Sequence, residues 1–329
     1  MKMRILDKSG YSIAELMISI MLSSILMAAA YATYTTQTRS YARQENTGEV
    51  NTQARIALGI ITEDIKSEGF GVPADMNSEP VNGRTAPIVI NDGGNGPDAI
   101  TLVSGFRQIG TLQNAVVAGA AQIRISYGGT SVHPNTTDRR YISIDGVAFN
   151  VVTITENDPV FTLRDAVPIS FPAGRPVYLV EDVTYCVSFT AGQTSGELRR
   201  IRRNANAARC EAANASDIEV IAGNVEDLQF AYAVDADTSG AIDDLNGNGR
   251  FDDGDYLYNG TNAGVITDVS TIKAFRVNIL ARSPREDSSM SAVMTPPANI
   301  ENRSRANVDV VTDHFVRRLW TGMAARRSM

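Results

Sequence analysis

The feature that most constrains this chain is an uncharged, largely apolar stretch near its N-terminus. From Leu16 to Thr38 the sequence contains 23 consecutive residues without a charged side chain. As a helix, this stretch is about 34 Å long, which exceeds the roughly 30 Å hydrocarbon core of a bilayer. After Arg39 the sequence is too polar, and too often interrupted by Gly, Pro and Asn, to cross a membrane again. We therefore predict one N-terminal anchor followed by a water-soluble remainder.

The residues in front of the anchor predict its orientation. Lys2, Arg4 and Lys8 precede the apolar stretch. Basic residues beside a membrane span stay on the cytoplasmic side, so we expect the N-terminus inside and the bulk of the chain outside.

Two processing pathways fit this segment. In an ordinary secretory signal, the apolar region ends in a small-residue cleavage site, and Ala28-Ala29-Ala30 supplies one, so that the mature chain begins at Tyr31. This hypothesis leaves Glu15 unexplained, because a carboxylate within a membrane span costs about 2.5 to 3.5 kcal/mol and is usually kept for a partner. Cleavage between Gly10 and Tyr11 instead retains the whole apolar helix, with Glu15 one turn from the new amine.

The second hypothesis is supported by a resemblance. The sequence KSGYSIAE, residues 8–15, followed by an apolar run, resembles the leader of the type IV prepilins, although Tyr11 stands where Phe is usual. The resemblance implies that a prepilin peptidase cuts after Gly10 and methylates the amine of Tyr11. It also implies that Glu15 neutralises the amine of a neighbouring subunit during filament assembly.

The helical pattern continues beyond the anchor. Apolar residues recur at spacings of three or four from Val50 to Ile65, and the sequence GFGVP, residues 69–73, ends the pattern. We expect a leader over residues 1–10, a helix over 11–68 about 87 Å long, and a globular head over 69–329.

The head has the pattern of a β structure. Short alternating or β-branched runs are separated by turn clusters such as NDGGNGPD, residues 91–98, which we interpret as a turn and not as a phosphate-binding loop. The runs cover residues 87–90, 99–104, 120–127, 149–155, 176–180, 183–189, 228–234 and 274–281. The predicted fold class is α+β, with a long N-terminal hydrophobic helix, as in the type IV pilin fold, packed on a large antiparallel β-rich head.

Four further blocks narrow the resemblance. They are residues 55–71 (RIALGIITEDIKSEGFG), 198–203 (LRRIRR), 223–235 (GNVEDLQFAYAVD) and 315–327 (FVRRLWTGMAARR). Together they are similar to the large minor pilins of the PilW type, although the residues after Gly322 depart from the usual ending. The type II secretion pseudopilins of the J type are the nearest rival family.

The two cysteines, Cys186 and Cys210, lie in the exported part of the chain. An oxidising compartment favours their pairing, so we expect a disulfide, with two buried free thiols as the alternative. Only His133 and His314 are present, which leaves few candidates for a zinc or Cys-His catalytic site.

An aspartate-rich segment, residues 235–255, matches the spacing of a calcium-binding loop. Asp244, Asn246, Asn248, Asp252 and Asp255 occupy the side-chain ligand positions, the carbonyl of Arg250 supplies a backbone ligand, and Gly249 lies where the loop turns sharply. An overlapping register begins at Asp235 and uses Asp237, Ser239, Gly240 and Asp243, with Asn246 in the last position. We expect one calcium ion at the Asp244 loop, with a second overlapping site as an option. The alternative is a solvated turn of the same composition.

Other functions are disfavoured. The net charge of -7 argues against nucleic-acid binding. We interpret the arginines at 199, 200, 202 and 203 as solvated residues of a strand with two polar faces, with contact to DNA or another anionic surface as the alternative. No nucleophile–base pair or nucleotide motif is evident, so we expect no enzymatic activity.

The resemblance therefore implies a minor pilin that primes a type IV pilus or lies at its tip. Its expected partners are other minor and major pilins, the prepilin peptidase, the inner-membrane assembly platform and, before assembly, the membrane itself. We expect it in the inner membrane first, and then in the periplasm or an extracellular filament. The alternatives are a J-type pseudopilin, or a secreted calcium-dependent adhesin cleaved after Ala30.

Overall fold

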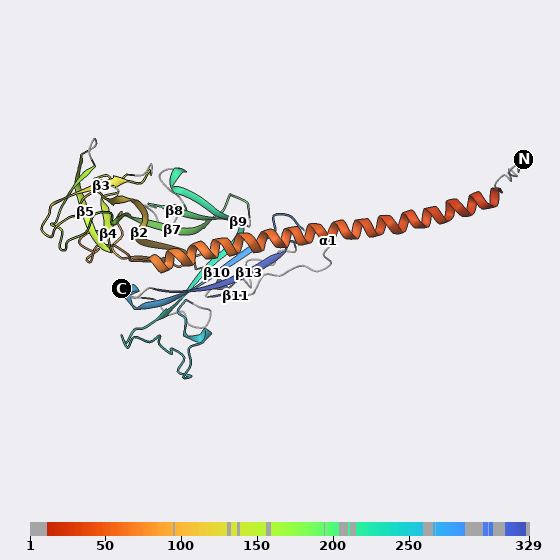
Figure 1. The fold of residues 1–329 in the computed structure, drawn as a ribbon. Coiled ribbons are helices and arrows are strands. Elements are labelled where there is room, and N and C mark those ends of the chain that lie inside the picture. Colours follow the sequence, from red (N-terminus) through yellow and green to blue (C-terminus); the bar gives the residue numbers. More distant parts are fainter. Residues whose placement is uncertain are drawn as a thin grey trace, which may run out of the picture.

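The computed structural model describes residues 12–94, 96–129, 133–136, 139–155, 159–193, 195–203, 210, 215–258, 266, 268–286, 299–301, 303–304 and 313–326. A single long helix, α1 (Ile13–Ser67), carries a β-rich head on its C-terminal part (Figure 1). The α+β architecture expected from the sequence is thus confirmed.

Only the C-terminal part of α1 packs against the head. The buried residues of the helix begin at Val50 and continue at spacings of three or four through Ala54, Ala57, Ile61 and Ile65. The part of the helix before Val50, called here the free half, extends away from the head (Figure 1). The helix ends beside a tight corner at Gly71, where φ is +69° and an added Cβ would lie within 2.3 Å of the Ser143 side chain. Only glycine fits at this position.

Among the residues that the structure describes, the head contains thirteen strands. Their bounds are β1 (Ile88–Asn91), β2 (Ala99–Leu112), β3 (Gln122–Tyr127), β4 (Tyr141–Ile144), β5 (Val147–Thr155), β6 (Val160–Leu163), β7 (Pro176–Ser188), β8 (Gly196–Arg202), β9 (Ile218–Val234), β10 (Ile272–Arg282), β11 (Asn299–Ile300), β12 (Arg303–Ser304) and β13 (Arg317–Ala325). The main sheet is antiparallel, with the order β1-β2-β7-β8-β9-β10-β13. Its inner face packs on α1 around Phe230, Tyr232 and Phe275.

A second, closed unit branches from the main sheet. The pairs β2–β3, β3–β6, β6–β5, β5–β4, β4–β7 and β7–β2 form a ring, which is a small β-barrel. The barrel has its own core, which includes Ile109, Ile142, Phe161 and Leu179. The runs expected separately at 176–180 and 183–189 are one strand, β7, because the same strand serves the barrel at one end and the main sheet at the other.

Candidate functional site: the anchor helix and the acidic loop

The first turn of α1 is closed by a capping box. The Ser12 hydroxyl accepts a hydrogen bond from the Ala14 N–H at 3.2 Å, and the Glu15 carboxylate accepts one from the Ser12 N–H at 3.0 Å. Glu15 therefore stabilises the N-terminus of its own helix, where a negative charge also complements the helix dipole. Gly10 and Tyr11, the expected processing residues, lie outside the described residues, as does the leader.

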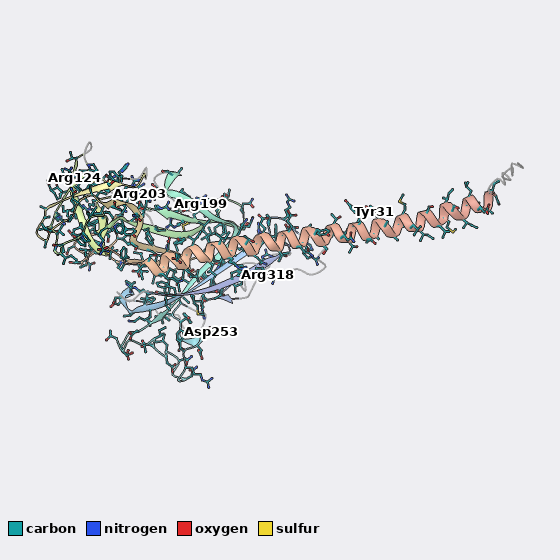
Figure 2. All side chains as sticks on the ribbon, viewed as in Figure 1. Tyr31, Arg124, Arg199, Arg203, Asp253 and Arg318 are labelled. Atoms are coloured by element: carbon teal, nitrogen blue, oxygen red, sulfur yellow. A yellow bond between two sulfur atoms is a disulfide. The ribbon has the colours of Figure 1, made fainter. Side chains whose placement is uncertain are left out.

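The free half of α1 has the composition of a membrane span. Its most apolar 18-residue window has a mean hydropathy of 2.0, and none of that window is buried against the rest of the protein. Tyr31 lies on this free half (Figure 2) and is 71% exposed. Such a surface is consistent with membrane anchoring, because exposed apolar side chains need a lipid or protein environment.

The acidic segment leaves the end of β9 and projects from the sheet face opposite α1 (Figure 1). Its residue Asp253 is exposed (Figure 2) and pairs with Arg276 of β10 at 2.7 Å. The Arg276 guanidinium also lies 4.1 Å from the ring of Tyr256. The loop is therefore fixed to the main sheet at one end.

The Asp244 loop is organised by side-chain oxygens that accept backbone N–H groups. Asp244 accepts from Asn248 at 3.1 Å and from Gly249 at 2.5 Å, and Gly249 has the φ of +78° that the sharp turn requires. The fully buried Asp255 carboxylate accepts from Asn246 at 3.1 Å and from Asp252 at 2.7 Å. These hydrogen bonds fold residues 244–255 into one compact turn held by its own carboxylates.

Among the described residues, the carboxylates of this loop differ in their ion pairing: Asp253 pairs with Arg276. Within the described part of the chain, neither Asp244, Asp252 nor Asp255 forms an ion pair. The pKa of Asp252 is lowered, chiefly by the Gly254 N–H and then by the amide of Asn248, which donates at 2.6 Å. Asp252 is thus held in the ionised form that a hard cation prefers as a ligand.

The overlapping register brings its carboxylates closest together. Oxygens of Asp235, Asp237 and Asp243 all lie within 4.8 Å of one another, and no other such acidic group is found among the described residues. However, Asp235 already pairs with Lys273 at 3.1 Å. Burial raises the pKa of Asp235, but Lys273 and the Gly240 N–H outweigh burial and lower it. The Asp235 register therefore already has a cationic side chain, Lys273, beside one of its carboxylates.

The arginines of β8, and Arg203 directly after it, form ion pairs, whereas the sequence predicted solvated side chains. Arg199 pairs with Glu197, Arg203 with Asp217, and both Arg200 and Arg202 with Glu219. Arg200 also binds Asp64 of α1 at 2.7 Å. These side chains hold strands and helix together instead of presenting a free basic surface.

The expected disulfide is present. Cys186 of β7 is bonded to Cys210, with the two Cα atoms 5.8 Å apart. Cys186 is buried in a small cluster with Ala99, Ile201 and Ile218. The bond ties the segment after β8 to the main sheet.

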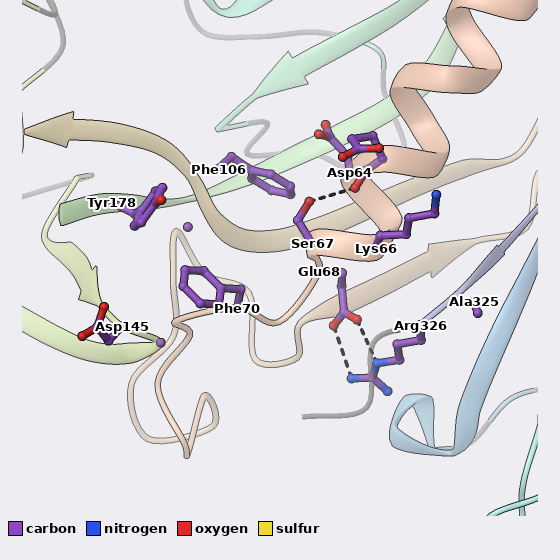
Figure 3. A pocket seen from close by; sticks show the side chains of 13 residues that line it. Asp64, Lys66, Ser67, Glu68, Phe70, Phe106, Asp145, Tyr178, Ala325 and Arg326 are labelled. Atoms are coloured by element: carbon purple, nitrogen blue, oxygen red, sulfur yellow. Dashed lines mark hydrogen bonds and ion pairs between the residues drawn. The ribbon is translucent and has the colours of Figure 1, made fainter. Parts of the chain in front are cut away.

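A pocket at the C-terminal end of α1 was not predicted from the sequence. The pocket has a volume of about 1090 Å³ and is bordered by Phe70, Phe106 and Tyr178 on one side and by Glu68 and Arg326 on the other (Figure 3). Arg326 donates to the buried Glu68 at 2.8 Å. Burial raises the pKa of Glu68, and Arg326 opposes that rise. Because 258 residues separate the two, sequence spacing could not have identified this pair.

One comparison with known proteins gives a match. Residues 178–325 match the family model PilW, described as Type IV Pilus-assembly protein W. No curated protein and no solved structure matches this chain. The matched region runs from within β7 to the end of β13, and so contains the acidic loop and most of the sheet that packs on α1. Over this region the chain is similar to a family of pilus assembly, which supports an association with type IV pili.

Proposed function

We propose that the chain is a minor subunit of a type IV pilus that primes filament assembly or lies at the filament tip. The observation that carries this proposal is the division of α1 into two parts. Its C-terminal part is built into the head, whereas its apolar N-terminal part is exposed. A helix of this kind is anchored in the inner membrane before assembly and packs among the helices of other pilins afterwards.

The decisive test is the N-terminus of the chain matured in its own host. Intact-mass measurement and N-terminal sequencing should find a chain that begins at methylated Tyr11. Gly10→Leu should leave the leader attached, whereas the control Ser9→Ala should be processed normally. A mature chain that begins at Tyr31 would lack the anchor, and this result would support a secreted binding domain instead. Processing at Gly10 without any chain in pili would favour the J-type pseudopilin.

We further propose that the Asp244 loop binds one calcium ion, held by Asp244, Asn246, Asn248, Asp252, Asp255 and the Arg250 carbonyl. Carboxylate, amide and backbone oxygens are the ligands that calcium takes in proteins. Within the described part of the chain, Asp244, Asp252 and Asp255 form no ion pair, which supports this donor set, because neighbouring anions repel one another unless a cation joins them. The Asp235 group would be the second site, weakened by the ammonium of Lys273.

Calcium binding can be measured by thermal unfolding of the detergent-solubilised chain, first in EGTA and then in millimolar CaCl₂. We expect calcium to raise the unfolding temperature, because it binds only the ordered loop. Asp244→Asn should weaken this effect, whereas Asp253→Asn, a change in the neighbouring carboxylate that pairs with Arg276, should not. An unfolding temperature that is identical in EGTA and CaCl₂ would contradict the proposal.

A further inference from the structure

One edge of the main sheet is open. Among the residues that the structure describes, β13 pairs only with β10, in a regular ladder from Ala274↔Ala325 to Arg282↔Arg317 without a bulge. Much of β13 is exposed, including Leu319 at 40% and Met323 at 70%. An edge strand of this kind presents unpaired N–H and C=O groups to its surroundings.

The hydrogen bonds at the two ends of the ladder identify the residues that face outward. The Arg326 N–H donates to the Lys273 carbonyl at 2.7 Å, and the Val316 carbonyl accepts from Ser283 at 2.8 Å. Even-numbered residues therefore direct their backbone groups toward β10. Because these directions alternate along an antiparallel strand, Leu319, Thr321 and Met323 direct theirs outward, enough for about six hydrogen bonds to another strand.

Within strand β13 itself, the residues that usually protect an edge are absent. Natural edge strands carry a proline, a bulge or a central charge that discourages pairing. From Leu319 to Ala325 the strand has no charge and no proline, and its ladder shows no register shift. The only exposed charge on the strand is Arg318, near its beginning (Figure 2).

The direction of α1 determines which kind of strand fits. Trp320 packs beside Val50 near the start of the helix–head contact, and Arg326 binds Glu68 at its end, so α1 and β13 run in the same direction. Two copies anchored in one membrane have parallel helices and hence parallel β13 strands. A two-fold antiparallel pair of β13 edges would place the two anchors at opposite ends, so antiparallel pairing with a second copy does not fit.

We propose that the outer edge of β13 binds an extended strand from a different pilus subunit, which continues the main sheet by one strand. This inference rests on the proposed function as a pilus subunit. The face that carries Leu319 and Met323 suits apolar side chains on the incoming strand. The opposite face carries Arg318 and, above Trp320, the guanidinium of Arg55 at 5.6 Å from the ring centroid, which suits a carboxylate. Main-chain hydrogen bonds would supply affinity, and these two faces would supply selectivity.

The matched variants Leu319→Pro and Leu319→Ala test the edge. The N–H of Leu319 points away from β10, so proline leaves the ladder to β10 intact while it removes an outward donor and blocks a neighbouring strand. In the native host, we expect Leu319→Pro to reduce the amount of the full chain in sheared pili by about tenfold or more, and Leu319→Ala to stay near the wild-type amount. Wild-type amounts of Leu319→Pro in pili would overturn the inference. Absence of the wild-type chain from pili would instead refute the proposed function.

A measurement on the wild-type chain covers the case in which Leu319→Pro does not fold. Hydrogen exchange of the Leu319, Thr321 and Met323 amides should be fast in the detergent-solubilised chain and about tenfold slower or more in pili. Equal exchange in both states would overturn the inference, as would amides already protected before assembly. Disulfide-linked dimers of Met323→Cys in pili would also overturn it, because they would place a second copy on the edge.

Discussion

The distance between α1 and β13 depends on one residue without a side chain. A Cβ at Gly322 would lie 2.7 to 2.9 Å from side-chain atoms of Leu58, closer than such contacts normally allow. Gly322 thus lets the helix lie directly on the strand at this point. The sequence places Leu58 in the apolar stripe of the helix, but it contains no signal that joins that stripe to Gly322.

Gly322→Ala should lower the free energy of unfolding by about 1 to 3 kcal/mol, because the added methyl group overpacks against Leu58. Leu58→Ala makes room for that methyl group, so the double variant should lose less stability than the two single variants together. Urea unfolding of all four chains measures this coupling. Strict additivity would show that the two residues are not in contact.

A buried carboxyl group predicts a pH dependence. Asp98 accepts N–H groups of Gly93 and Phe230, both at 2.9 Å, yet burial raises its pKa to about 7. Because the folded state binds a proton that the unfolded state releases near pH 4, Asp98 should lower stability as pH rises from about 4 to 7, by at most about 1.4 kcal/mol per pH unit. Below pH 4 and above pH 7, the contribution of Asp98 to the free energy of unfolding should not change with pH.

The comparison of wild type with Asp98→Asn isolates this contribution, because other buried carboxyl groups titrate equally in both chains. The difference in unfolding free energy between the two should change across pH 4 to 7 in the direction that favours the variant at higher pH. A difference that is constant with pH would show that Asp98 titrates alike in the folded and unfolded chain.

At the scale of elements, periodicity predicted the helix and most long strands. Residues 50–65 repeat every three or four positions, and β-branched alternation marks β3, β5 and β10. The four-residue strands β4 and β6 were not predicted, although β1, of the same length, was recognised from the run at residues 87–90. The barrel was not predicted either, since the return of β7 to β2 is a long-range pairing. The spacing of the acidic ligands could be recognised in the sequence because all of these residues lie within one short segment.

Removal of the disulfide should destabilise the head. The bond closes a loop with a sequence separation of 24 residues, for which the chain-entropy model gives up to about 3.5 kcal/mol. The double variant Cys186→Ala/Cys210→Ala should therefore unfold at a lower urea concentration, and reductant should lower the midpoint of the wild type toward the same value. A wild-type midpoint insensitive to reductant would contradict this expectation.

At the scale of the whole molecule, the head depends on only part of α1. The buried helix residues begin at Val50, so the free half contributes no core side chain. A chain that starts at residue 41 should fold without detergent and unfold at the same urea concentration as the full chain. A chain that starts at residue 59 loses Val50, Ala54 and Ala57 from the core and should be much less stable. Equal stability of the two truncated chains would contradict this division.

The parallel course of α1 and β13 also has a mechanical consequence. A force that enters through the N-terminus of the helix acts along the line of contact that runs from Trp320 to the Glu68–Arg326 pair. Because helix and strand lie side by side in the same direction, the pull loads all these contacts in shear at once instead of opening them one after another. The head is thus attached to its anchor in the geometry that best resists tension along the helix axis.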